Sequence, residues 1–398
     1  MDLVAECLGL RHWALSIFTG TIRRPELISA CPPASSRAWA LFLATEACAH
    51  ALSTCLAADV ALLPAHARCA LEHATRLEVQ RTMAARGQLA ALDVLAAESG
   101  VSPTVLKGGV HIADRGEAFD LADIDLLLTT AALELFHGVV LERGGYVVAP
   151  SIEQLSMDGG ITLELHDHLA VGPAKPIRLT GAARPIPGFR ALHQLAPADH
   201  VIYCIQHSTT KHPFRRGHLR DVLMIADAMN DCSPYDLALV EELLAASEHG
   251  VTYSETLRLA NAIRPGTAPG VPVRDVFRRI AACKYAAGQW IPDTSPLMAA
   301  LTYDRVAQFI TPPREWGAQI REYLVTDFPA SRARIPFAAR LSRRLTRPLE
   351  LAVRTPVRLV ALLSAFMIAM ALRGIHAYRW RQVAVSPLPE GGGFREGR

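Results

Sequence analysis

Two aspartates in the middle of the chain, Asp123 and Asp125, are the first residues whose type and spacing could do chemistry. They lie one residue apart in FDLADIDLLL (119–128), a run that otherwise has the apolar character of a buried strand. Side chains alternate along a strand, so the two carboxylates share one face. Their burial is costly unless a partner offsets their charge, and oxygen ligands favour Mg²⁺ or Mn²⁺ over zinc. The pair therefore predicts a site for a divalent cation.

A third acid lies in ITLELHDHL (161–169), which also has the pattern of a strand. Glu164, His166 and His168 share one face of it. If this strand neighbours the one that carries the aspartates, Glu164 completes a set of three carboxylates. Such a set can hold one or two metal ions, activate an oxygen nucleophile and neutralise a transferring phosphate.

Upstream of these acids, Lys107, Gly108 and Gly109 follow a short apolar strand. Glycines let backbone N–H groups approach a phosphate closely, and a helix N-terminus adds positive potential. Lys107 can contribute a compact charge to a phosphate or to the acids. These three residues therefore predict a phosphate-binding turn.

The elements that must position these residues form a small α/β unit between helical regions. Residues 36–57 and 66–99 are rich in Ala and Leu at helical spacing, with Gly100 as the stop signal. From residue 101 strands and helices alternate, and Asp158-Gly159-Gly160 predicts a hairpin turn. The fold class is therefore α+β, a small mixed sheet embedded between mostly helical regions. The expected divisions are a helical lead-in (1–100), an α/β core (101–195), a second helical region (196–330) and a basic C-terminal segment (331–398).

The composition is that of a globular protein, because 51% of the residues are hydrophobic and 20% are charged. A net charge of only +3 excludes strong polyelectrolyte character. The eight cysteines are scattered and form no C-x-x-C pair, which predicts reduced thiols in a reducing cytoplasm. MDLVAECLGL at the start of the chain has two acids and no basic region, so no secretory signal is expected.

The C-terminal segment differs in charge from the rest of the chain. Residues 332–381 contain eleven arginines and one acid, Glu350, and they enclose the uncharged apolar run 359–372. Its 14 residues fall short of the roughly 20 that cross a bilayer. Three interpretations stay open: a buried terminal helix, a helix on an anionic membrane surface, and a short tilted span. The expected location is cytoplasmic, with peripheral contact to the inner membrane if the second holds.

Taken together, these motifs resemble the nucleotidyltransferase superfamily that includes DNA polymerase beta and the kanamycin nucleotidyltransferases. The similarity is greater to a bacterial group known as the uncharacterised nucleotidyltransferase family. The shared motifs cover roughly residues 40–230 and are Leu106-Lys107-Gly108, Asp123-Ile124-Asp125-Leu126-Leu127, Gly145-Tyr146, Glu164-Leu165-His166, His207 and Leu219-Arg220-Asp221.

The resemblance implies a role for each matching residue. Asp123 and Asp125 would bind the metal, Mg²⁺ or Mn²⁺, and Glu164 would be the third carboxylate and a base for the incoming hydroxyl. The residues that would contact the nucleotide are Lys107, Gly108 and Gly109, and those that would line the pocket or support the ligands are His166, His207, Arg220 and Asp221. The implied reaction transfers a nucleoside monophosphate from a nucleoside triphosphate (NTP) such as ATP to a hydroxyl or phosphate acceptor. That acceptor could be a small molecule, a peptide, an RNA end or a protein.

Two departures from the family pattern favour a different function. Gly109 stands where the superfamily often has serine, and Asp120 lies in the stretch where the narrower group commonly has arginine. Both would weaken the grip on a triphosphate. The alternative is a catalytically degenerate binding or scaffold subunit of a biosynthetic system, held at the membrane by residues 332–381.

A further alternative is a metal hydrolase that uses His166, His168 and His207. Close to His207, the basic side chains of Lys211, Arg215, Arg216 and Arg220 could hold a substrate phosphate or an acidic partner, or could form a solvated surface.

Overall fold

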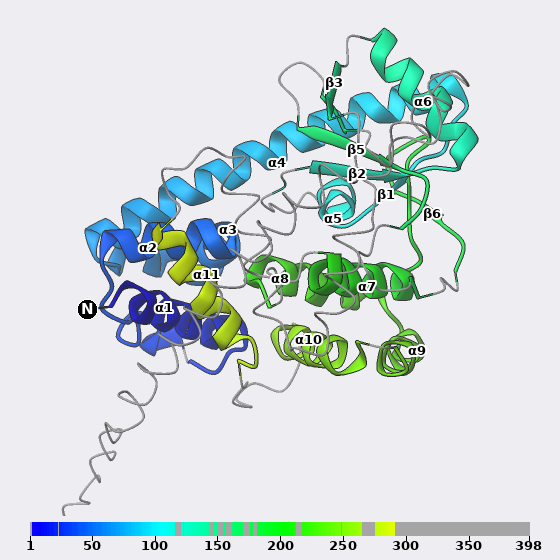
Figure 1. Ribbon diagram of the computed structural model, residues 1–398. Helices are drawn as coiled ribbons and strands as arrows, with labels where there is room; N and C mark the ends of the chain where they lie inside the picture. The colour runs from blue at the N-terminus through cyan, green and yellow to red at the C-terminus, as the bar shows by residue number, and fades with distance from the viewer. Residues whose placement is uncertain are drawn as a thin grey trace, which may run out of the picture.

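The structure is a computed structural model. It describes residues 2–22, 24–115, 121, 123–143, 146–149, 154–156, 161–169, 176–177, 181–211, 217–247, 249–264 and 275–290. Asp120, Gly145, Arg215, Arg216, the hairpin turn 158–160 and the basic segment with its apolar run 359–372 lie outside these residues. The predicted α+β class is confirmed, because helices surround one small mixed sheet (Figure 1).

The N-terminal helices are α1 (Leu3–Phe18), α2 (Ser36–Glu46), α3 (Ala49–Leu56) and α4 (Ala65–Ser99). Ser35 starts α2 as its N-cap, since its hydroxyl accepts the N–H of Ala38. The helical run 36–57 is broken at Ala47, whose φ of 47° is left-handed. Gly100, with φ 67°, ends α4 as predicted. Among the described residues no single helix has both the length and the apolarity to span a membrane, and α2 passes that test only jointly with residues 49–62, at a bend of 113°.

The sheet has the strand order β3-β4-β5-β2-β1-β7-β6. The strands are β1 (Thr104–Val105), β2 (Asp123–Leu127), β3 (Tyr146–Ala149), β4 (Gln154–Ser156), β5 (Thr162–His166), β6 (Arg184–Pro185) and β7 (His193–Gln194). β2 and β5 are parallel neighbours, and β4 pairs antiparallel with β5, as the predicted hairpin requires. Helix α5 (Gly108–Arg115) follows β1, and α6 (Thr130–Glu142) follows β2.

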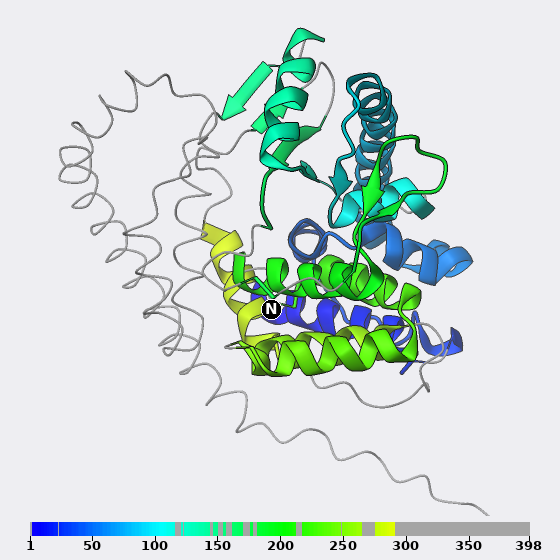
Figure 2. The same cartoon turned by 90° about the vertical axis from the view of Figure 1, so that its right-hand side faces the viewer.

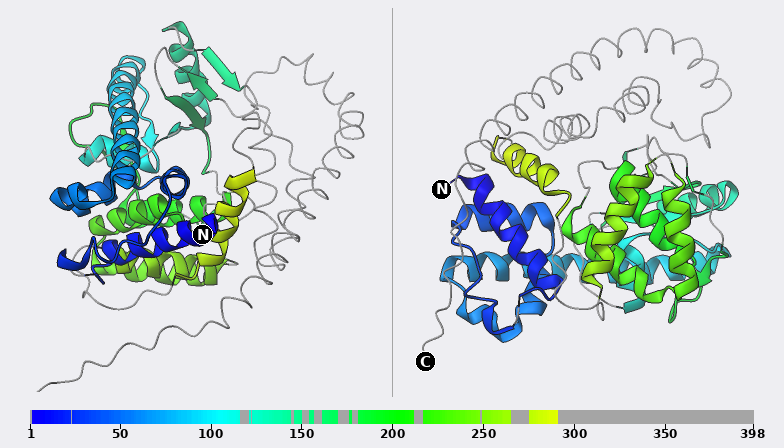
Figure 3. Two further views of the ribbon diagram at one scale, coloured as in Figure 1. Left: turned by 90° about the vertical axis from the view of Figure 1, so that its left-hand side faces the viewer. Right: turned by 90° about the horizontal axis from the view of Figure 1, so that it is seen from below.

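The second helical region follows the sheet. It comprises α7 (Pro197–Gln206), a π-helical turn (His207–Lys211), α8 (Leu219–Ala228), α9 (Pro234–Ala245), α10 (Gly250–Ile263) and α11 (Arg278–Trp290). Figures 1 and 2 show the sheet with α6 on one side of the molecule and α7 to α10 on the other. Seen from below, α1 to α3 lie beside α7 to α10, and α11 packs against α1 (Figure 3).

Two hydrophobic cores hold these layers together. One joins the helices of both helical regions around Trp13, Trp39 and Phe42. The other lies between the sheet, α4, α5 and α6, and contains Ile124 and Leu126 of β2. These two side chains alternate with the aspartates, so the face of β2 opposite the carboxylates points into the core, as its pattern predicts.

Helix α4 positions its neighbours through three buried polar side chains. The Glu78 carboxylate accepts the N–H groups of Ala49 and His50 at the start of α3, at 2.9 and 2.7 Å. The Gln88 amide holds Ile161, just before β5, by accepting its N–H at 2.6 Å and donating to its carbonyl at 2.8 Å. One α4 helix therefore orders both the helical lead-in and the strand that carries Glu164.

Asp93, a third side chain of this kind on α4, holds the chain before β7. Its carboxylate accepts the backbone N–H groups of Arg190, Ala191 and Leu192 at distances of 2.8 to 3.1 Å. Three backbone N–H groups, two of them buried, thereby find an acceptor, which fixes the segment that brings β7 alongside β1.

A buried charge cluster fixes the helices around α1. Arg11 on α1 pairs with Glu46 at 2.8 Å and with Asp275 at 2.8 Å. Glu46 also accepts the N–H of Leu219 at the start of α8 and the hydroxyl of Tyr285. Both side chains of the Arg11–Glu46 pair are almost fully buried, and such pairs tolerate the loss of one member poorly. The cluster therefore joins α1, α2, α8 and α11.

Candidate active site

Asp125 and Glu164 face each other across the parallel pair β2 and β5. The register places Asp125 opposite Glu164 and Asp123 opposite Thr162. Asp125 is 2% exposed and Glu164 is 8% exposed, so their charges are screened little by solvent. The conditional prediction that these strands are neighbours is therefore confirmed.

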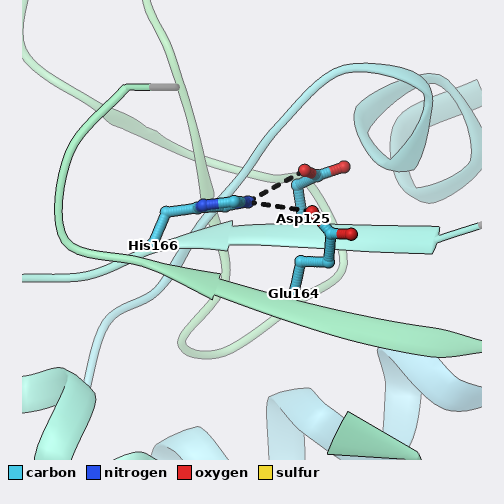
Figure 4. Close-up of side chains that lie close together, drawn as sticks. All are labelled: Asp125, Glu164 and His166. Carbon is cyan, nitrogen blue, oxygen red and sulfur yellow. Dashed lines mark hydrogen bonds and ion pairs between the residues drawn. The ribbon is translucent and has the colours of Figure 1, made fainter. Parts of the chain in front are cut away.

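His166, two residues after Glu164 on β5, points at both carboxylates (Figure 4). Its Nε2 lies 3.0 Å from Asp125 Oδ1 and 3.6 Å from Glu164 Oε2. A carboxylate accepts, so the Nε2 position carries a hydrogen in this arrangement. Asp125, Glu164 and His166 form the one group among the described residues whose potential ligand atoms all lie within 4.8 Å of one another.

Asp123 lies on the same face of β2 as Asp125 but outside this three-residue group. Its charge nevertheless acts on the site, because it contributes to the raised pKa of Lys107. The structure thus groups Asp125, Glu164 and His166, and Asp123 lies two residues before Asp125 on the same face of β2.

Lys107 lies beside Asp125 because β1 pairs with β2. The N–H of Leu106 donates to the carbonyl of Asp125 at 3.0 Å, and the ammonium of Lys107 is 2.5 Å from Asp125 Oδ2. Burial opposes the charge on Lys107, but the carboxylates of Asp125, Asp123 and Glu164 outweigh it and raise its pKa. Lys107 is therefore a permanent cation of the site at neutral pH.

The backbone at Lys107 is left-handed, with a φ of 51°. This region is unfavourable for a residue with a side chain, and such strain is often found at functional sites. The conformation turns the chain from β1 directly into α5, whose first residues are Gly108 and Gly109.

Both glycines lie where α5 begins against neighbouring side chains. A Cβ at Gly108 would lie 2.6 Å from Leu121 Cδ2, and one at Gly109 would lie 2.7 Å from Val105 Cγ1. The absence of serine at position 109 therefore has a local reason, which is the close packing of α5 on β1.

His207 and Tyr203 approach the carboxylates from α7. The Nε2 of His207, which begins the π-helical turn, lies 3.1 Å from Lys107 Nζ. Because Lys107 is a donor, this nitrogen of His207 accepts and its proton is assigned to Nδ1. π-Helical turns are frequent at functional sites.

The Tyr203 ring lies 5.7 Å from that of His207. Burial and the charges of Asp125, Glu164 and Asp123 raise the pKa of Tyr203 well above its usual value. Its hydroxyl is buried and has no hydrogen-bond partner among the described residues. Tyr203 is a site residue that the sequence analysis missed, since nothing in its local pattern distinguishes it from a core tyrosine.

Arg220 and Asp221 lie in the first turn of α8 and pair with each other, with Arg220 Nη2 2.9 Å from Asp221 Oδ1. Burial raises the pKa of the Cys204 thiol on α7, on which the charges of Lys107 and Asp221 also act. Asp221 and Lys107 therefore act on the same thiol, while Arg220 pairs with Asp221.

His168 lies away from this group. Its side chain is 68% exposed and its Nδ1 pairs with Asp167 at 2.6 Å. Among the described residues, His166, His168 and His207 form no group of potential metal ligands. The geometry therefore gives the hydrolase alternative no three-histidine centre in this part of the chain.

The donor set could hold a divalent cation. Its two carboxylates are ligands that Mg²⁺ and Mn²⁺ prefer, whereas the imidazole of His166 is a ligand that transition metals prefer. The carboxylates of Asp123, Asp125 and Glu164 also exceed the single ammonium of Lys107 by two charges, which one divalent cation would balance.

Comparison with known proteins identifies one family. A family model described as "Uncharacterised nucleotidyltransferase" matches residues 36–265, which is more than half of the chain. That span includes α4, the whole sheet and α7 to α10. No curated protein and no solved structure matches the chain.

Proposed function

Because the chain belongs to the uncharacterised nucleotidyltransferase family, we propose that it transfers a nucleoside monophosphate from an NTP to a hydroxyl or phosphate acceptor. Mg²⁺ or Mn²⁺ would be held by Asp125 and Glu164, with Asp123 and His166 beside them. The single observation that carries the proposal is the parallel pairing of β2 with β5, which sets Asp125 opposite Glu164. The acceptor is a small molecule, a peptide, an RNA end or a protein.

The acceptor would be activated by the carboxylates. Its oxygen attacks the α-phosphorus, a new O–P bond forms, the bond to the bridging oxygen breaks, and pyrophosphate leaves. For a hydroxyl acceptor the proton goes to Glu164, the acid beside Asp125. A bound divalent cation supplies charge stabilisation to the transferring phosphoryl group.

The triphosphate would be held by the turn between β1 and α5. Gly108 and Gly109 let the backbone at the start of α5 approach phosphate oxygens, and the helix N-terminus favours their negative charge. Lys107 adds a compact positive charge at the same turn. The residues predicted to bind nucleotide and those predicted to bind metal are adjacent, because the Lys107 ammonium touches Asp125.

The test is label transfer from each α-³²P-labelled NTP, with Mg²⁺ and a cell extract as the source of acceptor. Asp125→Asn should reduce transfer at least 100-fold, because it removes a charge from the cation site. Asp167→Asn is the matched control, since Asp167 follows β5 and pairs with the exposed His168, and it should transfer label normally.

Two results would contradict the proposal. One is a wild-type chain that binds no NTP by calorimetry with either Mg²⁺ or Mn²⁺, which is the outcome that the scaffold alternative predicts. The other is full transfer by a folded Asp125→Asn variant, which would move the chemistry elsewhere.

A further inference from the structure

The chain supplies its own cation to the carboxylate at the centre of the site. Lys107 Nζ lies 2.5 Å from Asp125 Oδ2, and His166 Nε2 lies 3.0 Å from Asp125 Oδ1. Both oxygens of Asp125 are thus already bonded to donors from the protein. A divalent cation that uses Asp125 must replace one of these donors or lie close to it.

Of the two donors, Lys107 is the one whose presence opposes a second cation. In a buried site the repulsion between an ammonium and a divalent cation is large, since solvent screens it little. The Lys107 ammonium can move to a second partner, because its flexible stem starts one residue before α5, where the phosphates are expected.

We propose that Lys107 is an internal competitor of the divalent cation at Asp125, and that cation binding moves its ammonium from Asp125 to the nucleotide phosphates. This inference rests on the proposal that the carboxylates bind a divalent cation. It adds that the cation and the triphosphate increase each other's affinity, because each makes the exchange of partners by Lys107 more favourable. The cation takes Asp125 from Lys107, and the phosphates give Lys107 a new partner.

His207 is the second point that holds the ammonium in place. Its Nε2 is 3.1 Å from Lys107 Nζ, so the cation is shared between Asp125 on β2 and His207 at the end of α7. Movement of Lys107 would break this link between sheet and helix. The exchange would therefore change a contact of α7 as well as one of the sheet.

The first test measures Mn²⁺ affinity by electron paramagnetic resonance at pH 8, without nucleotide. Lys107→Met keeps an unbranched side chain at the strained position and removes the charge. We expect it to bind Mn²⁺ at least tenfold more tightly than the wild type. Arg68→Met removes one positive charge from an exposed position on α4 and should bind Mn²⁺ as the wild type does. Equal or weaker Mn²⁺ binding by folded Lys107→Met would overturn the inference.

The second test needs no folded Lys107 variant. Reductive methylation of the wild-type chain, read by mass spectrometry, should modify Lys107 faster when Mn²⁺ is present than when it is absent. An unchanged rate at saturating Mn²⁺ would overturn the inference. These outcomes are separate from the proposed function. Tighter Mn²⁺ binding by Lys107→Met without label transfer would support the lysine exchange and contradict the proposed function. Label transfer without tighter Mn²⁺ binding or faster methylation would support the proposed function and contradict the lysine exchange.

Discussion

The hydrogen bonds between Gln88 and Ile161 make a prediction about how α4 positions β5. Gln88→Leu removes the acceptor of the Ile161 N–H, at 2.6 Å, and the donor to its carbonyl, at 2.8 Å. Each lost bond costs about 1 kcal/mol, and up to about 3 kcal/mol where the remaining group is buried. The leucine regains about 1 kcal/mol through apolar burial. We expect the free energy of unfolding to fall by about 2–3 kcal/mol.

Urea unfolding of the full chain, followed by far-UV circular dichroism, measures this loss. Gln80→Leu is the matched control, because Gln80 is exposed on the same helix and the substitution is the same. Since Ile161 directly precedes β5, Mn²⁺ affinity should also fall in Gln88→Leu. A difference between the two variants of less than about 0.5 kcal/mol, which is typical of surface changes, would show that the Gln88 amide does not position β5.

Three further predictions concern other contacts. Gly109→Ser should destabilise the chain by about 1–3 kcal/mol through overpacking against Val105, and Val105→Ala should cost less in that variant than in the wild type when both are measured by urea unfolding. Burial lowers the pKa of Lys284 to about 8, although Glu46 opposes it. The unfolded chain therefore binds more protons above that pH, and the wild type should gain about 2 kcal/mol over Lys284→Met between pH 7 and 10. Asp93→Asn should cost about 1–3 kcal/mol, because the amide replaces one acceptor oxygen with a donor facing the Arg190 N–H and removes the charge that strengthens the hydrogen bonds from residues 190–192.

Each of these has a control in the same chain. Gly87→Ser lies on α4 where a Cβ meets nothing within 4 Å, so it should not destabilise. Glu98→Gln breaks an exposed pair with Arg143 and should cost less than about 1 kcal/mol. Arg68→Met should show the same pH dependence as the wild type. If a control variant changed the free energy of unfolding as much as its test variant does, the predicted contact would not explain the effect.

The carboxylate arrangement could be predicted from the sequence because it depends on local rules. Alternation along a strand puts Asp123 and Asp125 on one face, and the hairpin signal before Glu164 places that residue on a strand of the same sheet. The proximity of Asp125 to Glu164 then needed only the pairing of β2 with β5, which the structure has.

The contacts that support the site could not be predicted in this way. Gln88 reaches Ile161 across 73 positions, and Lys107 reaches His207 across 100, with no periodic signal that connects them. The break between α2 and α3 at Ala47 could not be predicted either, since neither glycine nor proline marks it. Such features follow from packing of distant elements, which a single sequence does not reveal.

The buried polar side chains of α4 have a consequence for whether the sheet could fold by itself. A chain cut at residue 100 would begin just before β1 and would contain every strand. It would nevertheless lack Gln88 and Asp93, so the backbone before β5 and before β7 would lose the groups that complete its hydrogen bonding. Helix α4 also carries Glu78, which caps α3. We therefore expect the sheet to fold only together with α4, so that moving the strands into another protein would require moving α4 with them.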